Sequence, residues 1–487
     1  MISRYFPNTL LSPTTLRRFI LFVITCAACV LVVYSSGSSG ASPSKKLIDF
    51  GADNPKSEFV RRNITKMEKQ SFFSGFTMLL APGTNVFNKT AYPESEFASD
   101  RANLKATRFK KFTHNFIRMD TRREEGWTWL NDANWEAALE NVRQFTRTAK
   151  VGKFDGIFFD TESYGSTPWK YKAEDYDGKS YKEVSVVVRQ RGRDFINVVH
   201  QEMPGAKIIS LWFLRIIKKM VVDDGRKMEN MDWALLVPFF EGWLDGGKGE
   251  QFIDGNENSY FNLTKQDYAK DRAAFTSSAK LLSASSQAKF KQRVRLAHAM
   301  FLDGSINWFR SPRFAGFYFP SDQSRLQQVE HNIYESLKTS DEYVWAYSEH
   351  VDWWKGSAPK GLAAAMKRGV DKVQAGKPLG FDMKAVSEKV KKDYERRIFI
   401  RGKITKADKG LYQTAAVVES GYKDLSNKES ACTISPEGEY TCELPYGWKG
   451  TLTPKLANES FEPPMRDYSN KTFGPGAWLE NQNFATR

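Results

Sequence analysis

Two carboxylic acids separated by one residue, Asp160 and Glu162, close the apolar run FDGIFFDTE at positions 154–162. Alternate residues of a β-strand face the same side, so we expect the two side chains on one face, with Glu162 nearer the end of the strand. Two carboxylates held close together repel each other when both are ionised, which raises the pKa of one of them. A carboxyl group that stays protonated near neutral pH is suited to general acid catalysis.

Such an acid works with a second carboxylate, which either attacks the substrate or activates a water molecule. We expect Glu349 to be this partner, because it shares a strand face with Trp345 and Tyr347. Glu241, which follows two phenylalanines, is the second candidate. The segment 254–260 offers groups that hydrogen-bond a substrate, or alternatively groups that cap the next helix. The residues expected to contact the substrate are Trp212, Trp243, Asp254, Glu257, Trp345 and Tyr347.

Nine short apolar runs alternate with amphipathic helical patterns from position 46 onward, which is typical of βα units with a parallel sheet. Their number favours a (β/α)₈ TIM-type barrel over a doubly wound sheet, whose usual Gly-x-Gly-x-x-Gly turn the sequence lacks. In such a barrel the carboxyl ends of the strands converge on one cleft, so acids that close the runs should share a pocket. The runs, which compete for eight strand positions, are 46–51, 73–80, 115–120, 154–163, 207–214, 234–243, 251–257, 294–304 and 342–350.

The barrel is expected to span 46–390 and to be followed by a second domain at 391–487. Short strand-like runs split by Gly, Pro, Asn and Ser predict a small all-β sandwich there. Cys432 and Cys442, ten residues apart, are consistent with one disulfide across a hairpin in an oxidising compartment.

The phrases at 444–450 and 461–470 resemble the Ig-fold or carboxypeptidase-regulatory-like accessory modules of secreted bacterial enzymes. That resemblance implies a structural or adhesive module without catalysis. The alternative is a carbohydrate-binding module, whose exposed aromatic side chains would have to be Tyr446 and Trp448.

The N-terminal region predicts passage into or across a membrane. Residues 1–18 end in Arg17-Arg18 and are expected to stay in the cytoplasm, and the uncharged run 19–34 reads as a signal peptide or a transmembrane anchor. A buried N-terminal helix is the alternative. Residues 35–45 read as a flexible stalk. We therefore expect an extracytoplasmic protein, either secreted or a single-pass type II protein with the membrane as a partner.

Several other chemistries are disfavoured by the sequence. The formal net charge is +15, but 72 Lys and Arg are dispersed among 57 Asp and Glu, and no nucleic-acid motif is present, so nucleic acid is not an expected partner. The five histidines lack zinc-site spacing, and we expect neither a metal nor another cofactor. A calcium ion held by oxygen ligands stays open. Neither a Gly-x-Ser-x-Gly elbow nor a P-loop occurs.

The segment 154–162 resembles the fourth-strand motif of the family-18 glycoside hydrolases, the chitinase-like barrels, in which Asp-x-x-Asp-x-Asp-x-Glu follows a Phe-Asp-Gly-Ile opening. The match is carried by Asp155, Asp160 and Glu162, whereas Phe158 occupies the position of the middle aspartate. The resemblance implies that Glu162 is the general acid and that Asp160 is its partner.

The expected function is therefore glycoside hydrolysis of an extracytoplasmic polysaccharide or glycan, by carboxylate acid/base or nucleophilic catalysis. The alternative is a catalytically inactive barrel that binds glycans or cell-wall material, for which Phe158 is the main indication. A type II membrane glycosyltransferase fits the anchor topology, but its nucleotide-sugar site would usually need a doubly wound sheet, which the pattern of runs does not favour. A second carboxylate beside Glu162 would favour hydrolysis over binding.

Overall fold

The chain was analysed as a computed structural model. The residues that it describes are 45–162, 167–305, 322–395, 397–405, 417–420, 432–434, 438–445, 448–456, 459–474 and 477–486. The predicted cytoplasmic segment 1–18 and membrane segment 19–34 lie outside the described residues, as does all but the last residue of the stalk 35–45. Within the described part of the chain, no helix combines the length and the apolar character needed to cross a membrane.

Parallel strands form a closed barrel. In the sheet order β7-β6-β5-β4-β3-β2-β1-β9-β8, every neighbouring pair of strands is parallel, and the two ends of the order, β7 and β8, are separated by one residue, Ala297. One chain segment therefore pairs with β6 through its first half and with β9 through its second half, which closes the sheet with eight strand positions. The predicted TIM-type barrel is confirmed. The strands are β1 (Lys46–Gly51), β2 (Gly75–Met78), β3 (Phe116–Asp120), β4 (Gly156–Asp160), β5 (Lys207–Ser210), β6 (Gln251–Asp254), β7 (Val294–Leu296), β8 (His298–Phe301) and β9 (Tyr343–Ser348).

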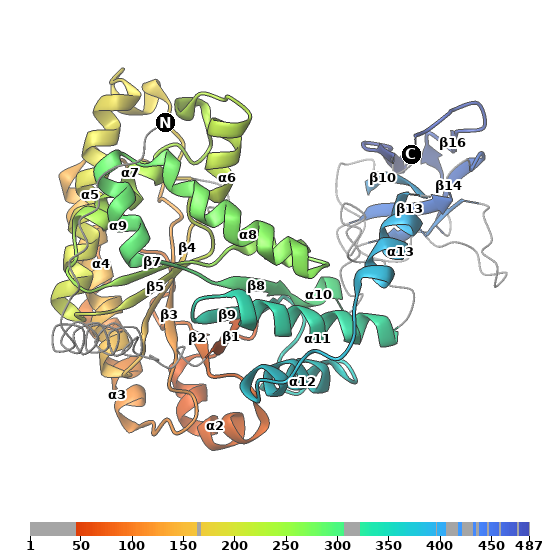
Figure 1. Ribbon diagram of the computed structural model, residues 1–487. Coiled ribbons are helices and arrows are strands. Elements are labelled where there is room, and N and C mark those ends of the chain that lie inside the picture. Colours follow the sequence, from red (N-terminus) through yellow and green to blue (C-terminus); the bar gives the residue numbers. More distant parts are fainter. Residues whose placement is uncertain are drawn as a thin grey trace, which may run out of the picture. The chain divides into compact units, whose positions relative to one another are not determined.

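Helices surround the strands, with α4 and α5 on one side of the barrel and α11 and α12 on another (Figure 1). The N-terminus of α5 is fixed by a capping box in which Ser180 and Glu183 each accept from the other's backbone N–H. The helices of this region are α2 (Ser57–Gln70), α3 (Ala98–Ala106), α4 (Asp132–Val151), α5 (Tyr181–Glu202), α6 (Arg215–Lys218), α7 (Leu236–Asp245), α8 (Lys265–Ser278), α9 (Ala284–Arg293), α10 (Leu302–Ser305), α11 (Asp322–Thr339), α12 (Leu362–Gln374) and α13 (Lys384–Glu395).

The prediction of a strand at 234–243 is wrong, because these residues form most of helix α7. Its side chains are buried on nearly all faces, and an apolar run of this length cannot be told from a buried strand by periodicity alone. Helices α5 and α7 approach closely at Gly192 and Gly242. A Cβ built on Gly242 would lie 2.1 Å from the carbonyl oxygen of Arg189, so the contact requires glycine.

Replacing Gly242 by Ala should destabilise the protein by about 2 kcal/mol, because the added methyl group must push α5 and α7 apart. The measurement is urea-induced unfolding followed by circular dichroism. Gly249→Ala is the matched control, since its Cβ would meet its nearest neighbour at an ordinary 3.9 Å. Equal unfolding free energies for the two variants would contradict the close packing of the two helices.

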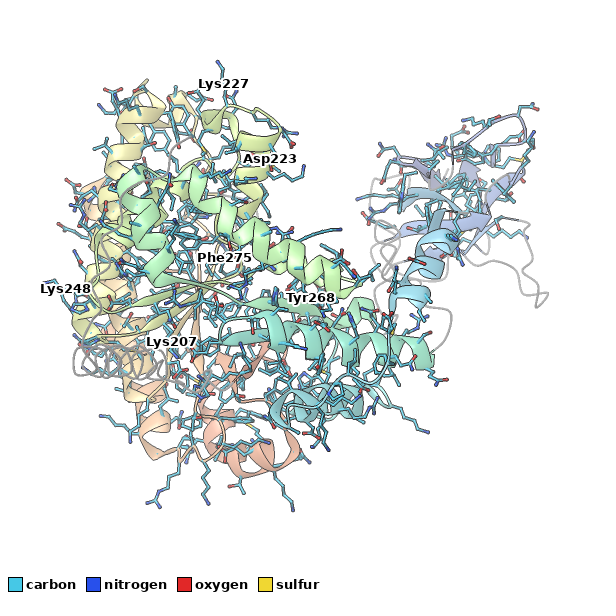
Figure 2. All side chains as sticks on the ribbon, viewed as in Figure 1. Lys207, Asp223, Lys227, Lys248, Tyr268 and Phe275 are labelled. Carbon is cyan, nitrogen blue, oxygen red and sulfur yellow. A yellow bond between two sulfur atoms is a disulfide. The ribbon has the colours of Figure 1, made fainter. Side chains whose placement is uncertain are left out.

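A polar cluster fills the amino-terminal end of the barrel, opposite the end where the strands finish. Lys207, labelled in Figure 2, donates to the Glu342 carboxylate at 2.7 Å and to the Tyr343 hydroxyl at 2.8 Å. Tyr343 in turn donates to Asp155, whose carboxylate also contacts His114 Nδ1 at 2.7 Å. These bonds join strands β4, β5 and β9, and this end of a barrel serves stability.

The expected boundary between residues 390 and 391 falls inside α13, and the first strand of the C-terminal region begins at Arg397. Two sheets share one apolar core there. The predicted disulfide between Cys432 and Cys442 is present and bridges paired strands β12 and β13. Trp448 is buried in this core rather than exposed as a carbohydrate-binding module would need, and Tyr446 lies outside the described residues. The strands are β10 (Arg397–Thr405), β11 (Val417–Glu419), β12 (Thr433–Ile434), β13 (Glu439–Pro445), β14 (Thr451–Lys455), β15 (Phe461–Glu462), β16 (Arg466–Asp467), β17 (Trp478–Leu479) and β18 (Phe484–Thr486).

Candidate active site

Strand β4 carries the Asp160 and Glu162 pair to the carboxyl end of the barrel. Phe158 stacks on Phe50 of β1, with ring centroids 4.3 Å apart, and because β1 and β4 are not neighbours this contact crosses the barrel interior. Alternation along the strand then turns Asp160 inward, above the aromatic rings. Glu162 follows directly, and its backbone N–H donates to Asp160 Oδ1 at 2.9 Å.

An arginine inside the barrel contacts Asp160 of this pair. Arg118 of β3 donates to Asp120 at 2.7 Å and to Asp160 at 2.9 Å, and its guanidinium carbon lies 5.1 Å from the ring centroid of Phe50. Asp120 and Asp160 are register partners on adjacent strands, so one cation bridges two neighbouring carboxylates. Arg118 was not selected as a site residue from the sequence. Arg118 and Asp120 are two residues apart in an otherwise apolar strand and so face the same side, which could have been read from the sequence.

The surroundings favour the neutral form of Asp160. Burial raises the pKa of Asp160 to about 7, the negative charge of Asp120 adds to this rise, and the Arg118 guanidinium opposes it. Glu162 raises the pKa further through its own charge. The carboxyl group is therefore held near the midpoint of its titration at neutral pH.

Glu257 joins the pair from another strand. It follows β6 and begins the short 3₁₀ turn Glu257–Phe261. Burial raises the pKa of Glu257 to about 8, and the charges of Glu162 and Asp160 contribute to that rise. Electrostatic coupling of this kind requires proximity. The sequence placed Glu257 among the substrate contacts, and the structure adds it to the carboxylate cluster.

Glu257 is positioned by Asn256, which adopts a left-handed backbone conformation with φ 47° and ψ 55°. Asparagine tolerates this conformation better than most residues. Its side-chain amide donates to Asp271 at 2.9 Å and to His298 at 3.0 Å, while its oxygen accepts from Arg215 at 2.7 Å. Burial lowers the pKa of His298 to about 3, so the ring is neutral and accepts this bond.

Asp254, predicted to contact the substrate, belongs to the supporting network instead. It is buried, and its carboxylate accepts from the backbone N–H of Asn256 at 2.9 Å. Burial raises its pKa to about 6, and the Arg215 guanidinium opposes that rise. The residue fixes the start of the loop that holds Glu257.

Aromatic side chains form the floor and one wall of the site. Trp345 is fully buried, and its indole donates to the Gly255 carbonyl oxygen at 2.9 Å, so it is a floor residue. Tyr260 lies with its ring centroid 5.4 Å from Trp345 and 6.2 Å from the half-buried Tyr347. Glu349 is exposed at the rim and accepts from the Tyr347 hydroxyl at 3.4 Å. It stays a candidate, further out than Glu257.

Three predicted site residues lie elsewhere. Glu241 belongs to α7 in the outer helical layer, where it pairs with Arg189 at 2.9 Å and caps the Ser283 backbone. Trp243, on the same helix, is fully buried against the outside of the sheet. Glu241 and Trp243 are absent from the site because the run 234–243 forms a helix of the outer layer and not a strand of the barrel. Trp212 is 3% exposed and packs edge-on against another indole, so it presents no open face for stacking.

The described residues contain no group of three or more His, Cys, Asp or Glu side chains arranged to hold a metal ion.

No protein-family model and no curated protein match the chain. Similar solved structures include a family-5 glycoside hydrolase from Prevotella bryantii B14, 10% identical over 68% of this chain and 97% of that one, with a TM-score of 0.37. The family-18 chitinase ChiB of Flavobacterium johnsoniae is 9% identical over 68% and 96%, with a TM-score of 0.30. The 3-keto-D-glucoside 4-epimerase of E. coli is 11% identical over 68% and 99%, with a TM-score of 0.31. Likeness at this level assigns no activity.

The raised pKa values predict that stability falls as pH rises. The unfolded chain releases the protons of Asp160 and Glu257 near their ordinary pKa values of 3.8 and 4.5, whereas the folded protein keeps them until about pH 7 and 8. The folded state thus binds more protons across this window, and the unfolding free energy decreases with pH. Glu257→Gln should reduce this decrease and be more stable than the parent at pH 9 by up to several kcal/mol, since each unit of pKa shift is worth roughly 1.4 kcal/mol. Thermal unfolding between pH 5 and 9 measures both effects.

Glu136→Gln is the control for this comparison, because Glu136 is an exposed acid on α4. It should follow the parent at every pH. A Glu257→Gln protein that loses as much stability as the parent between pH 5 and 9 would show that Glu257 is not held protonated in the folded state.

Proposed function

We propose that the protein is a glycoside hydrolase that cleaves glycosidic bonds of an extracytoplasmic polysaccharide or glycan. The observation that carries the proposal is the interaction of Glu162 and Glu257, which follow the ends of β4 and β6: burial raises the pKa of Glu257, and the charge of Glu162 raises it further. Glycosidic bond cleavage needs two carboxyl groups, one protonated and one ionised.

The raised pKa makes Glu257 the proton donor. Its carboxyl group transfers a proton to the glycosidic oxygen as the bond from this oxygen to the anomeric carbon breaks. Glu162, ionised, stabilises the positive charge that develops on the sugar ring, and it then attacks the anomeric carbon or deprotonates a water molecule. These roles differ from the resemblance-based expectation, which gave the acid role to Glu162.

The other residues of the site support this chemistry. Asp160 accepts from the Glu162 backbone N–H at 2.9 Å and so orients the segment that carries the ionised group. Arg118 keeps Asp160 in place and limits the negative charge of the cluster. Tyr347 and Tyr260 offer ring faces to the apolar side of a sugar, and Glu349 at the rim accepts from its hydroxyl groups.

Catalysis is tested by incubating the purified protein with a panel of polysaccharides and measuring the reducing ends released. We expect the parent to release them, and Glu162→Gln and Glu257→Gln each to lower kcat by roughly 10²–10⁴-fold because each removes one half of the pair. Glu349→Gln should retain more than a tenth of the activity, and Glu136→Gln should match the parent. Full activity of Glu257→Gln would reject its role as the acid.

The two carboxyl groups are told apart with an aryl glycoside of the sugar that the panel identifies. A nitrophenolate leaves without protonation, so Glu257→Gln should regain most of its activity on this substrate while Glu162→Gln stays inactive. With the polysaccharide, kcat/KM should fall above about pH 8 as Glu257 loses its proton. Glycan binding by a parent protein that releases no reducing ends would favour the inactive, glycan-binding alternative.

The location outside the cytoplasm is part of the proposal. It rests on the apolar run 19–34 behind Arg17-Arg18 and on the Cys432–Cys442 disulfide, a bond that persists in oxidising compartments. Protease added to intact cells or sealed vesicles should degrade a membrane-anchored form, and a cleaved form should be found in the medium. Complete protection of a cell-associated protein would contradict this location.

A further inference from the structure

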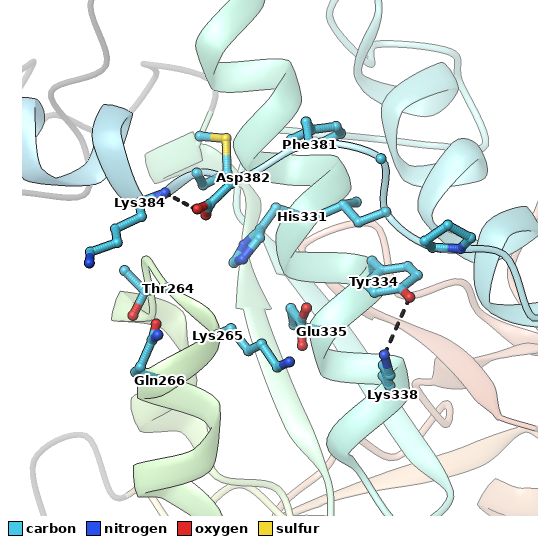
Figure 3. Close-up of a pocket in the computed structure, with 14 residues that line it drawn as sticks. Thr264, Lys265, Gln266, His331, Tyr334, Glu335, Lys338, Phe381, Asp382 and Lys384 are labelled. Atoms are coloured by element: carbon cyan, nitrogen blue, oxygen red, sulfur yellow. Dashed lines mark hydrogen bonds between the residues drawn. The ribbon is translucent and has the colours of Figure 1, made fainter.

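A cavity lies in the outer helical layer of the barrel, and the residues that line it do not include the carboxylate cluster. Its volume is about 410 Å³, and it is lined by the start of α8, one face of α11 and the segment 378–384 (Figure 3). Small-molecule sites have volumes of roughly 300–1,000 Å³, so this cavity has room for a monosaccharide.

One carboxylate in this cavity lacks a partner. Glu335 of α11 is 5% exposed, and among the described residues no donor reaches its Oε2 atom. A buried acceptor that is left unsatisfied costs about 1–3 kcal/mol, and more when the group is charged. Oε2 has almost no accessible surface, so a ligand in the cavity reaches this carboxylate through its other oxygen, Oε1, and a hydrogen bond donated there stabilises the buried group.

His331 presents a second acceptor from the same helix face, one turn before Glu335. Its Nδ1 lies 2.9 Å from Asn332 Oδ1, and this oxygen also accepts from the Gln328 amide, so Nδ1 carries the proton. Burial lowers the pKa of His331, which leaves the ring neutral and Nε2 free to accept. Figure 3 shows His331 and Glu335 side by side at the cavity.

Cations outnumber acids around these two acceptors. The lining includes three lysines, Lys265, Lys338 and Lys384, and two carboxylates, Glu335 and Asp382, which with a neutral His331 leaves one net positive charge. The cavity therefore suits a ligand with one negative charge.

We propose that this cavity binds a sugar acid, a single sugar ring with neighbouring hydroxyl groups and one carboxylate. The hydroxyl groups donate to Glu335 Oε1 and His331 Nε2, and the carboxylate pairs with Lys265 and Lys338. The apolar side chains of the lining, Leu379, Phe381 and Met383, contact the C–H groups of the ring. A neutral sugar leaves the lysines without a counter-charge, and a simple carboxylate leaves both acceptors unsatisfied.

Isothermal titration calorimetry of the full chain carrying Glu162→Gln tests this proposal with D-glucuronate, D-glucose and acetate as probes. Because that background is expected to lack turnover, any heat reports binding. We expect D-glucuronate to bind at least tenfold more tightly than D-glucose or acetate. Equal affinity for D-glucuronate and acetate would reduce the cavity to an anion site, equal affinity for D-glucose would remove the role of the lysines, and either result overturns the proposal.

Variants of the lining locate the binding. Glu335→Gln and Lys338→Met should each weaken D-glucuronate binding at least tenfold, and Lys280→Met, an exposed lysine outside the lining, should leave it unchanged. Lys338 is exposed, so its replacement is expected to leave folding intact even where Glu335→Gln disturbs it. Unchanged affinity in Lys338→Met would place the sugar acid elsewhere. The outcome is independent of the proposed glycosidase activity, which the reducing-end assay measures separately.

Discussion

The filled interior of the barrel is the constraint on which the candidate site depends. Phe50, Phe158 and Trp345 meet across the interior and exclude water from it, so charged groups are confined to the ends of the strands. Asp160 lies directly above these rings and is therefore buried with water on one side at most. Arg118 reduces the cost of this burial, since it pairs with Asp160 and stacks over Phe50 at once. The same apolar floor that stabilises the barrel thus raises the pKa values on which the proposed acid catalysis relies.

Bringing several carboxyl groups together destabilises the fold, and hydrogen bonds to the outer helices hold the groups in place. Asp160 and Glu257 resist ionisation because both are buried, and the negative charge of Glu162 adds to the rise in the pKa of each. A cluster of this kind relaxes when one of its members can move away, and the contacts of Asn256 prevent this for Glu257. Its amide is bonded on the far side of the loop to Asp271, a buried residue of α8. Sites that hold like charges together trade stability for activity, and such sites are held by rigid surroundings.

Eight of the nine predicted strands could be found from the sequence because a short apolar run between two amphipathic helical patterns is most often a buried strand of a parallel sheet. The strand prediction for 234–243 was wrong because the side chains of this helix are buried on nearly all faces, so the sequence shows no helical period. Asp160 and Glu162 were predictable because their geometry is local to one strand. The partnership with Glu257 was not, since it requires the closed order of β4, β5 and β6 and the left-handed conformation of Asn256. Arg118 was missed for a related reason, because an arginine in a buried strand makes physical sense only once its acidic neighbours are known.

The loop that carries Glu257 is tied to the helical layer at its other end too. Asn332 of α11 accepts from His331 and donates to the backbone oxygen of Asn262 at 3.0 Å, and the Asn262 amide donates to Asp271 at 2.8 Å. Asp271 accepts from Asn256 through the same oxygen, so an unbroken series of hydrogen bonds runs from the α11 cavity to the residue before Glu257. Each member of this series is buried and has its partners fixed by the next, which makes its geometry sensitive to any change at either end. The placement of the proposed acid is therefore set by helices outside the barrel as much as by the strand that precedes it.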